Sequence, residues 1–318
     1  MKNESRIVVG VDIGGTKVAA GLVNAEGEIL ARNRAPMRTT GAPSNGLAAV
    51  STAISGLFPA PSQHQIAAIG ICAPGPLNPK TGVIINPPNL PIWHNYPLAE
   101  EMRRVYDVPV RVDNDANAAA LAEAKWGAGR AYRNFFYATV GTGIGTGIIL
   151  DGRIFHGKTG AAGEGGHLGI DINGPLCNCG KRGCIETLAA GPAIARRARQ
   201  KLSQNPNSVL REMAGGDIQT VTSEMVGKAH AVNDPVAKEV MRETLDLLAY
   251  WLGSIIDLLE PDAIVIGGGV SSLLAPFLDE IRERWRGACI NPHPLDIPLV
   301  LAHYGEDAGI AGAAALCE

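Results

Sequence analysis

The stretch that decides the fold is Ile7-Val-Val-Gly-Val-Asp-Ile-Gly-Gly-Thr-Lys-Val-Ala-Ala-Gly-Leu-Val23. Two apolar, β-branched runs flank a glycine pair, which is the pattern of two strands joined by a tight turn. A second turn at Asn24–Gly27 and a short run at Glu28–Ala31 continue the pattern. We therefore expect the chain to begin as an antiparallel meander of three strands.

The same layout recurs later in the chain. A strand is expected over Asn134–Val140, a glycine and threonine turn over Gly141–Gly147, and a strand over Thr146–Leu150. Asp151-Gly152 is a hairpin signal, and Arg153–Phe155 is the third run. Two copies of one layout predict two structurally related domains that face each other.

Each meander is followed by alternating helical and extended patterns. After the first we expect helices over 44–58 and 97–106 and strands over 66–72 and 108–112. After the second we expect helices over 192–204, 222–233 and 235–259, a strand over 263–266, a helix continuing to about 286 and an alanine-rich helix over 305–316. We expect a small α/β domain at 1–113, completed by the helix at 305–318, and a large α/β domain at 114–304.

Composition limits the possible partners. The 318 residues carry 28 basic and 31 acidic side chains, for a net charge of −3. This balance predicts no nucleic-acid footprint and no polybasic membrane patch. Residues 1–6 show no apolar signal core, and no apolar run is long enough to span a bilayer. Together with cysteines too sparse for a disulfide scaffold, these features predict a cytoplasmic protein.

Four candidate metal ligands form the pattern H-x9-C-x-C-x4-C, at His167, Cys177, Cys179 and Cys184. Three thiolates and an imidazole suit a closed, four-coordinate Zn2+ site of structural type. The alternatives are buried thiols or a disulfide, but a bridge between Cys177 and Cys179 would be strained. The isolated Cys72, Cys289 and Cys317 are interpreted as buried or incidental thiols.

Two carboxylates flank this cluster, Glu164 before the histidine and Glu186 after the last cysteine. A Cys3His zinc site has no need of them, because its four positions are already filled. We therefore expect another ligand to use these acids.

The glycine turns are candidate phosphate-binding elements. Gly14, Gly15, Thr16 and Lys17 lack the Walker spacing, and a plain hairpin turn is the simpler interpretation. A matching turn at Gly141, Thr142 and Gly143 favours phosphate, because paired turns offer backbone N–H groups to a polyphosphate from two sides. Asp12 lies where a carboxylate could hold hydrated Mg2+. The glycines Gly267, Gly268 and Gly269, between a strand and a helix, fit a nucleoside crevice or simply tight packing.

A candidate general base lies at the start of the helix expected over 116–124. Asn and Asp are favoured helix N-caps, but one cap does not account for Asp113, Asn114 and Asp115 together. A helix start stabilises an ionised carboxylate. Asp115 can therefore accept a proton from a substrate hydroxyl, with Asn114 hydrogen-bonding a neighbouring hydroxyl.

These motifs together resemble the ROK family of sugar kinases. The matching segments, in chain order and over essentially the whole chain, are Asp12–Lys17, Ala73–Pro76, Asn114–Ala118, Gly141–Gly145, Glu164–His167 and Cys177–Glu186. The resemblance implies an α/β, two-domain actin/hexokinase-like (ribonuclease H-like) fold with an interdomain cleft. It also implies that a C-terminal helix returns to the N-terminal domain.

The resemblance further implies the roles of individual residues. Asp115 is the implied catalytic base, and the implied sugar ligands are Asn114, Asp115, Glu164, His167 and Glu186. His167 would serve zinc with one ring nitrogen and the sugar with the other. Within the family, Asn86–Trp93 resembles the corresponding stretch of bacterial glucokinases. Gly75 and Asn89 are further candidate sugar contacts, although both could equally be loop structure.

The expected function is ATP-dependent phosphorylation of a hexose at its 6-hydroxyl, with glucose as the expected hexose and with ATP and Mg2+ at the two turns. Kinases for N-acetylmannosamine, N-acetylglucosamine, mannose or fructose remain open, as does polyphosphate as donor. A sugar-sensing DNA-binding repressor is disfavoured, because the first strand begins at Ile7 and the charge does not suit DNA. A non-catalytic sugar-binding protein is the third alternative. The resemblance implies a homodimer or homotetramer.

Overall fold

The computed structural model describes residues 7–58 and 66–318. The expectation that residues 1–6 carry no targeting signal lies outside the described residues. The chain forms two compact units. The first contains the described residues within 1–133, 147–163 and 302–318, and the second contains 134–146 and 164–301. The predicted domains at 1–113 and 114–304 divide the chain differently and stay a prediction.

The first unit contains a five-stranded sheet in the order β3-β2-β1-β4-β7. Its strands are β1 (Ile7–Ile13), β2 (Lys17–Val23), β3 (Ile29–Pro36), β4 (Ile66–Ala73) and β7 (Val110–Asn114). Strands β1, β2 and β3 pair antiparallel, whereas β4 pairs parallel with both β1 and β7. The predicted N-terminal meander is therefore confirmed, and β3 runs further than expected.

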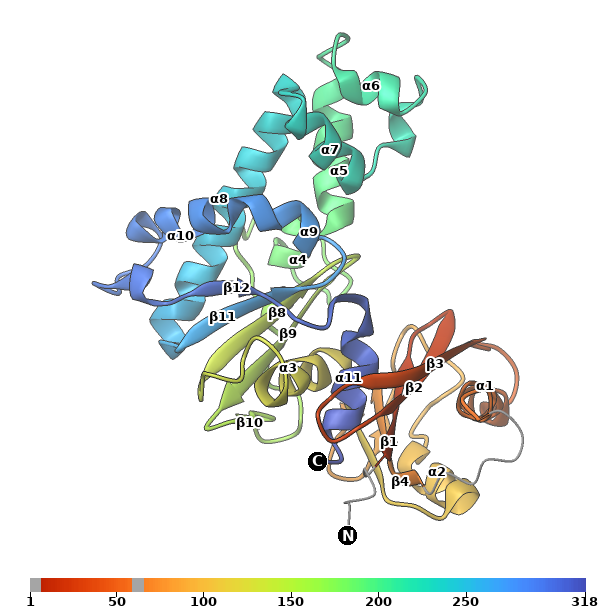
Figure 1. Ribbon diagram of the computed structural model, residues 1–318. Helices are drawn as coiled ribbons and strands as arrows, with labels where there is room; N and C mark the ends of the chain where they lie inside the picture. The colour runs from red at the N-terminus through yellow and green to blue at the C-terminus, as the bar shows by residue number, and fades with distance from the viewer. Residues whose placement is uncertain (1–6, 59–65) are drawn as a thin grey trace. The chain divides into compact units, whose positions relative to one another are not determined.

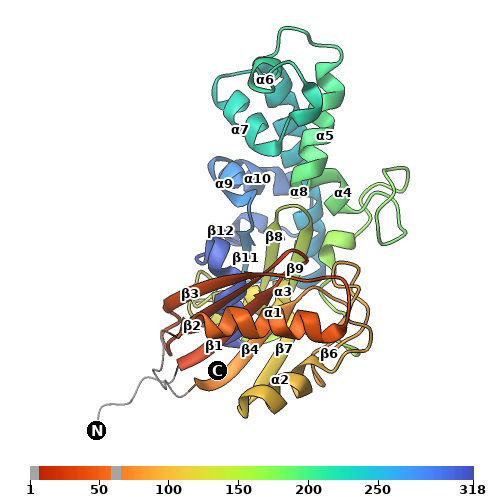
Figure 2. The ribbon, with the colours of Figure 1, turned by 90° about the vertical axis from the view of Figure 1, so that its right-hand side faces the viewer.

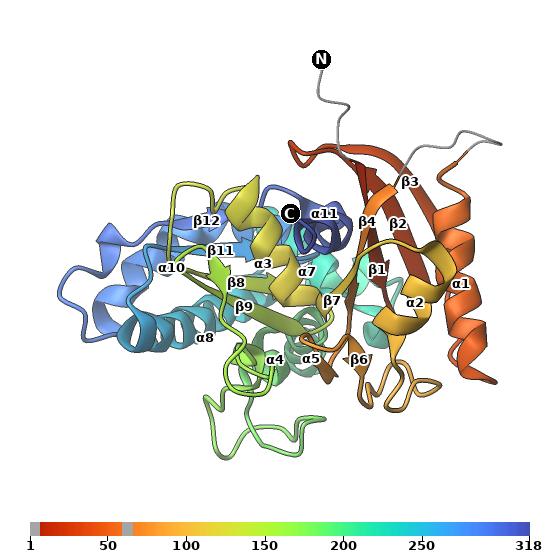
Figure 3. The same cartoon turned by 90° about the horizontal axis from the view of Figure 1, so that it is seen from below.

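Helices cover both faces of this sheet (Figure 3). On one face α1 (Pro43–Ser55) contacts β1, β2 and β3, and α2 (Leu98–Tyr106) contacts β7. Alternate residues of β1 point into this core, where Val9, Val11 and Ile13 are buried. On the other face α11 (Ala308–Ala315) lies on β1 and β4 and packs along α3 (Asp115–Lys125) (Figure 1).

Glycines on the second face bring α11 unusually close to the sheet. Gly10 of β1 pairs with Gly70 of β4. A Cβ atom on Gly10 would lie 2.1 Å from the carbonyl oxygen of Ile310, and one on Gly70 would lie 1.7 Å from that of Ala313. The helix matches this surface with alanines at 311 and 313–315, all buried. The C-terminal helix thus belongs to the first unit.

The second sheet has the order β10-β9-β8-β11-β12 and so repeats the plan of the first (Figure 1). Its strands are β8 (Phe135–Val140), β9 (Ile144–Leu150), β10 (Arg153–Ile154), β11 (Ala263–Gly267) and β12 (Leu299–Leu301). Strands β8, β11 and β12 pair parallel. The shared order confirms the two related layouts, although neither β12 nor the two-stranded β5 (Leu77–Asn78) and β6 (Val83–Ile84) was expected.

The second unit is organised around α8 (Pro235–Leu259), which Asp234 caps by accepting from the N–H of Ala237. Trp251 of α8 is fully buried, packs edge-on against Phe136 and donates to the carbonyl of Gly165. The helices that contact α8 or extend this layer are α4 (Ile185–Ala189), α5 (Gly191–Leu202), α6 (Val209–Met213), α7 (Ser223–Ala231) and α10 (Leu278–Arg284) (Figure 2).

Two expectations about this unit were wrong. The turn expected over Gly141–Gly147 is shorter, because β9 already begins at Ile144. The single helix expected after the three glycines is broken into α9 (Ser271–Leu274), a 3-10 turn and α10. The break falls at Pro276, which has no N–H to donate to the preceding turn. Among the described residues, no helix combines the length and apolar character needed to cross a membrane.

Replacing Gly70 with alanine tests the glycine contact under α11. The new methyl group would collide with the backbone of α11 rather than with a movable side chain, so we expect Gly70→Ala to lower the free energy of unfolding by about 1–3 kcal/mol. Chemical denaturation measures this. Gly287→Ala is the matched control, because its Cβ would meet nothing within 4 Å. Equal stability of the two variants would contradict the proposed fit.

Candidate functional site

An acidic row lies at one edge of the first sheet. Asp12 pairs with Cys72 across β1 and β4, and Cys72 pairs with Asp113 across β4 and β7. Since these strands run parallel, their carboxyl ends share an edge, and in-register residues face the same side. Burial, together with the charges of Asp12, Asp115 and Asp113, raises the pKa of the Cys72 thiol. Three carboxylates therefore converge on one buried thiol.

Asp12 is held beneath the start of α11. The Cys72 thiol lies 3.5 Å from its Oδ1, and a Cβ on Gly309 would lie 2.5 Å from its Oδ2. Burial raises the pKa of Asp12, while the hydrogen bond from Cys72 and the charge of Lys17 oppose that rise. A cation beside Asp12 would favour the ionised carboxylate. The group therefore has the environment of a cation ligand.

The first glycine turn follows Asp12 directly. The N–H of Gly14 donates to the carbonyl of Lys17 at 2.9 Å, which closes the turn, while Thr16 and Lys17 are exposed. Gly15 lies against Asn89, whose carbonyl oxygen would be 3.2 Å from a Cβ on that glycine. The turn and the segment around Asn89 are therefore neighbours within the first unit.

The start of α3 presents Asn114 and Asp115. Asn114 is the N-cap, and its Oδ1 accepts from the N–H groups of Ala116 at 2.9 Å and Asn117 at 3.3 Å. Its amide nitrogen faces Gly75, where a Cβ would lie 3.8 Å away. Asp115 is exposed and accepts from the N–H of Ala116. The cap thus uses one oxygen of Asn114 and leaves its amide donors directed toward Gly75.

The segment that carries Asn89 is anchored by its apolar neighbours. Leu90 and Trp93 are fully buried, and the Trp93 indole N–H donates to the carbonyl of Pro43. Trp93 also stacks on Tyr96. Asn89 itself stays exposed. The segment is therefore held in place by its buried neighbours, and the side chain of Asn89 is exposed on it.

The sequence pattern did not identify His156 as a candidate site residue. It lies after β10, and its Nε2 is 2.6 Å from Oδ2 of Asp113. The hydrogen bond with Asp113 raises the pKa of His156. No local pattern reveals this pair, because its members lie 43 residues apart in the chain.

The candidate metal ligands are brought together in the second unit. The ligand atoms of His167, Cys177, Cys179 and Cys184 all lie within 4.8 Å of one another. Cys177 Sγ is 3.5 Å from His167 Nδ1, and Cys179 Sγ is 3.6 Å from Cys184 Sγ. Tetrahedral coordination with thiolate bonds near 2.3 Å requires sulfurs about 3.8 Å apart. The donor set therefore fits a four-coordinate metal such as zinc.

The three thiols of this cluster differ in acidity. Cys179 is exposed, and a hydrogen bond from the Lys181 N–H lowers the pKa of its thiol. Cys184 is buried, and burial together with the neighbouring thiols raises its pKa to about 12. A bound metal would reverse the second effect, because it binds the thiolate.

Glu186 joins the metal loop to the second glycine turn. Its Oε2 accepts from the N–H of Ile144 at 2.9 Å and lies where a Cβ on Gly143 would approach to 2.4 Å. The turn itself closes through the N–H of Gly141 and the carbonyl of Gly143, and Thr142 is exposed at its tip. A larger residue at 143 would therefore displace this carboxylate from its present position.

Glu164 lies at the other end of the metal loop. It is exposed and directly precedes the 3-10 turn Gly165–His167, whose last N–H donates to its carbonyl. That turn is fixed from two sides, because Thr146 accepts from the N–H of Gly165 and Trp251 donates to its carbonyl. The elements around Glu164 are thus rigidly supported.

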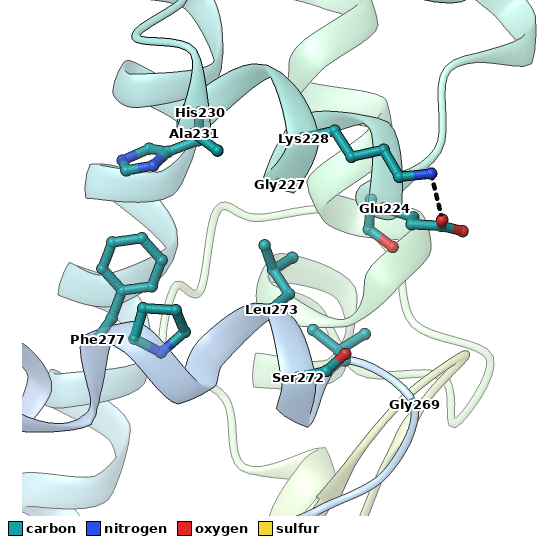
Figure 4. Close-up of a pocket in the computed structure, with 12 residues that line it drawn as sticks. Glu224, Gly227, Lys228, His230, Ala231, Gly269, Ser272, Leu273 and Phe277 are labelled. Carbon is teal, nitrogen blue, oxygen red and sulfur yellow. Dashed lines mark ion pairs between the residues drawn. The ribbon is translucent and has the colours of Figure 1, made fainter.

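Gly268 and Gly269, which follow β11, lie beside the second glycine turn, and Gly269 lines a pocket. The N–H of Val270 donates to the carbonyl of Val140, and a Cβ on Gly268 would collide with the same carbonyl. A pocket of about 720 Å³ lies between α7 and residues 269–277. Figure 4 shows Lys228 paired with Glu224 at 2.7 Å on one wall and His230 facing Phe277 on another.

Thiol reactivity tests the described acidities. In protein treated with a chelator, iodoacetamide should modify Cys179 before Cys184 at neutral pH, because a lowered pKa and exposure both increase the reactive thiolate. Peptide mass spectrometry over a time course measures the order. Modification of Cys184 first would contradict the assignment.

This chain is similar to known proteins over nearly its whole length. The model of the ROK family matches residues 8–318. A glucokinase from Streptomyces coelicolor is 37% identical, with 98% of this chain and 97% of the relative covered. An N-acetylmannosamine kinase from Escherichia fergusonii is 32% identical, with 97% of each covered. The crystal structure of a ROK glucokinase from Streptomyces griseus, in complex with glucose and AMPPNP, covers 98% of both chains at 35% identity and a TM-score of 0.83. The chain belongs to the ROK family and has the actin-like sugar kinase fold, as the resemblance implied.

Proposed function

We propose that this protein transfers the γ-phosphoryl group of ATP to the 6-hydroxyl of a hexose, and that glucose is its substrate. Support comes from the glucokinase relative and from the related structure with glucose and AMPPNP, both of which cover nearly the whole chain. The observation in the structure that carries the proposal is the acidic edge, where the exposed Asp115 at a helix start and the half-buried Asp12 beside a phosphate-type turn both act on the Cys72 thiol.

Asp115 acts as the general base. Its place in the first turn of α3 stabilises the ionised carboxylate through the helix dipole. The sugar O6–H gives its proton to Asp115 as the oxygen attacks the γ-phosphorus. The O6–P bond forms while the bond from phosphorus to the bridging β,γ-oxygen breaks, and ADP leaves. Positioning matters more than basicity in such a reaction.

The remaining sugar hydroxyls are bound by Asn114, Glu164, His167 and Glu186. Asn114 offers its amide donors, since its oxygen is used by the helix cap. The carboxylates accept hydrogen bonds from hydroxyls. Gly75 and Asn89 are further contacts in this proposal, supported by their closeness to Asn114 and Gly15 respectively.

ATP is bound by the glycine turns and the nearby pocket. The backbone of Gly14, Gly15, Thr16 and Lys17 and that of Gly141, Thr142 and Gly143 would contact phosphates, with Lys17 adding a positive charge. The pocket beside Gly269 has a volume suited to a nucleoside, and the glycines at 267–269 leave the approach open. Mg2+, held through Asp12, would neutralise charge on the phosphates.

Zinc is proposed as a structural ion bound by His167, Cys177, Cys179 and Cys184. Support comes from the compact donor set. The metal would fix the tautomer and orientation of His167, whose Nδ1 faces Cys177, and leave Nε2 for the sugar. A structural ion of this kind acts by holding the loop between Glu164 and Glu186.

The sugar itself is the main alternative within the proposal. The N-acetylmannosamine kinase relative keeps that sugar open, as do N-acetylglucosamine, mannose and fructose. A coupled assay of ADP release over these hexoses and glucose decides between them, with polyphosphate tested as the donor. A non-catalytic sugar-sensing protein would show binding without turnover in the same assay.

Several earlier expectations stay predictions. These are the interdomain cleft, cytoplasmic location, and assembly as a homodimer or homotetramer. Light scattering coupled to size-exclusion chromatography measures the assembly.

Removing the base tests the chemical role of Asp115. We expect Asp115→Asn to lower kcat by roughly 10²–10⁴-fold, the usual contribution of general-base catalysis, with the KM for sugar nearly unchanged. Steady-state kinetics measures both constants. Asp279→Asn is the control, because that side chain is 99% exposed in its ion pair. If Asp115→Asn turns over at nearly the rate of the unmodified protein, Asp115 is not the general base.

Disrupting the metal loop tests the proposed zinc. We expect Cys179→Ser to lose zinc and to raise the KM for sugar by more than it lowers kcat, because the loop carries sugar ligands rather than the base. Atomic emission analysis measures zinc, and Cys289→Ser serves as a cysteine control away from the cluster. Purified protein without zinc would contradict the proposal.

A further inference from the structure

Asp113 is a buried carboxylate that the proposed chemistry leaves without a role. Its side chain is 5% exposed and uses both oxygens. Oδ1 accepts from the N–H of Asn114 at 2.7 Å and from the side-chain amide of Asn117 at 3.2 Å. Both partners belong to the junction where β7 passes into α3. Asp113 therefore holds the backbone that presents Asn114 and Asp115.

The other oxygen of Asp113 is held by His156. The Nε2–Oδ2 distance is 2.6 Å, and the imidazole is 31% exposed. An ionised carboxylate only accepts, so Nε2 is the donor. The loop carrying His156 is closed on itself, because the His156 carbonyl accepts from the N–H groups of Gly160 and Ala162. The loop that carries His156 thus places the imidazole to donate a charge-assisted hydrogen bond to the buried carboxylate of Asp113.

We propose that His156 is a positioning residue for phosphoryl transfer, whose Nε2–H fixes Asp113 and through it the junction that presents Asn114 and Asp115. This inference rests on the proposed function. His156 acts through Asp113 rather than on the substrate. A purely structural ion pair would stabilise the fold without altering the reaction, so the two possibilities make different predictions.

Within this junction, the side chain of Asn117 depends on Asp113. Asn117 is buried, its Oδ1 has no hydrogen-bond partner among the described residues, and its amide nitrogen donates to Asp113. Loss of the imidazole would leave Oδ2 of Asp113 buried and unpaired, which is costly for an ionised group. Asp113 would then rotate, and the rotation would change how it holds Asn114 and Asn117.

A small shift at this junction would act mainly on turnover. Displacing a base by about 1 Å can lower a rate roughly 10²-fold. We expect His156→Ala to lower kcat at least tenfold, with the KM for ATP within twofold. His156→Gln should recover most of kcat, because its amide nitrogen can replace Nε2 as donor. His303→Ala, an exposed histidine of the same unit, is the control.

The pair itself is tested by a double-mutant cycle in kcat with His156→Ala and Asp113→Asn. Non-additive effects are expected, since both changes break one interaction. Three results would overturn the inference: kcat of His156→Ala within twofold of the unmodified protein, equal loss in the Ala and Gln variants, or additive effects in the cycle. If His156→Ala does not fold, the Gln variant and Asp113→Asn still decide it.

A spectroscopic measurement separates this inference from the proposed function. In ¹⁵N-labelled protein the Nε2–H of His156 should give a downfield proton signal that Asp113→Asn removes. Persistence of that signal in Asp113→Asn would overturn the pair whether or not any hexose is phosphorylated. Absence of turnover on every hexose by the unmodified protein would instead overturn the proposed function.

Discussion

The contact between α11 and the paired glycines of β1 and β4 is the constraint on which the first unit depends. Gly10 and Gly70 let the helix backbone rest directly on the sheet, and the alanines of α11 complete the fit. The same approach sets the start of α11 over Asp12 and Cys72, where Gly309 makes room for the carboxylate. The packing of small residues therefore determines where the acidic edge lies. Larger side chains at either glycine would move the helix and the groups beneath it together.

Much of this architecture was predictable because its signals are local. Local patterns predict these elements. Glycines mark the turns, alternation marks strand β1, and a long apolar pattern marks helix α8. The cysteine and histidine spacing predicted a cluster that the structure assembles within 4.8 Å. Short elements such as β12 and α4 escaped prediction, since three to five residues carry too little periodicity. The break at Pro276 has a local signal in the proline itself, which lacks a backbone N–H.

What the sequence concealed are relations between distant residues. His156 and Asp113 meet only because the β10 loop folds back to the end of β7, and neither has a local pattern that announces the other. The contact of Glu186 with Ile144 and Gly143 is of the same kind, since it joins the metal loop to a turn far earlier in the chain. Such pairs form because the strand order, which repeats in both sheets, brings distant segments of the chain together.

The place of α11 also has a consequence for biosynthesis. Residues 308–315 leave the ribosome after every residue of the second unit, yet they cover one face of the sheet that is made first. The second unit can therefore bury its core while strands β1 and β4 still expose one apolar face to the solvent or to chaperones. Gly10 and Gly70 of that face lack side chains, so the surface left uncovered around them is less apolar than one of leucine or isoleucine. The face that α11 covers last therefore suits a period of exposure to solvent during synthesis.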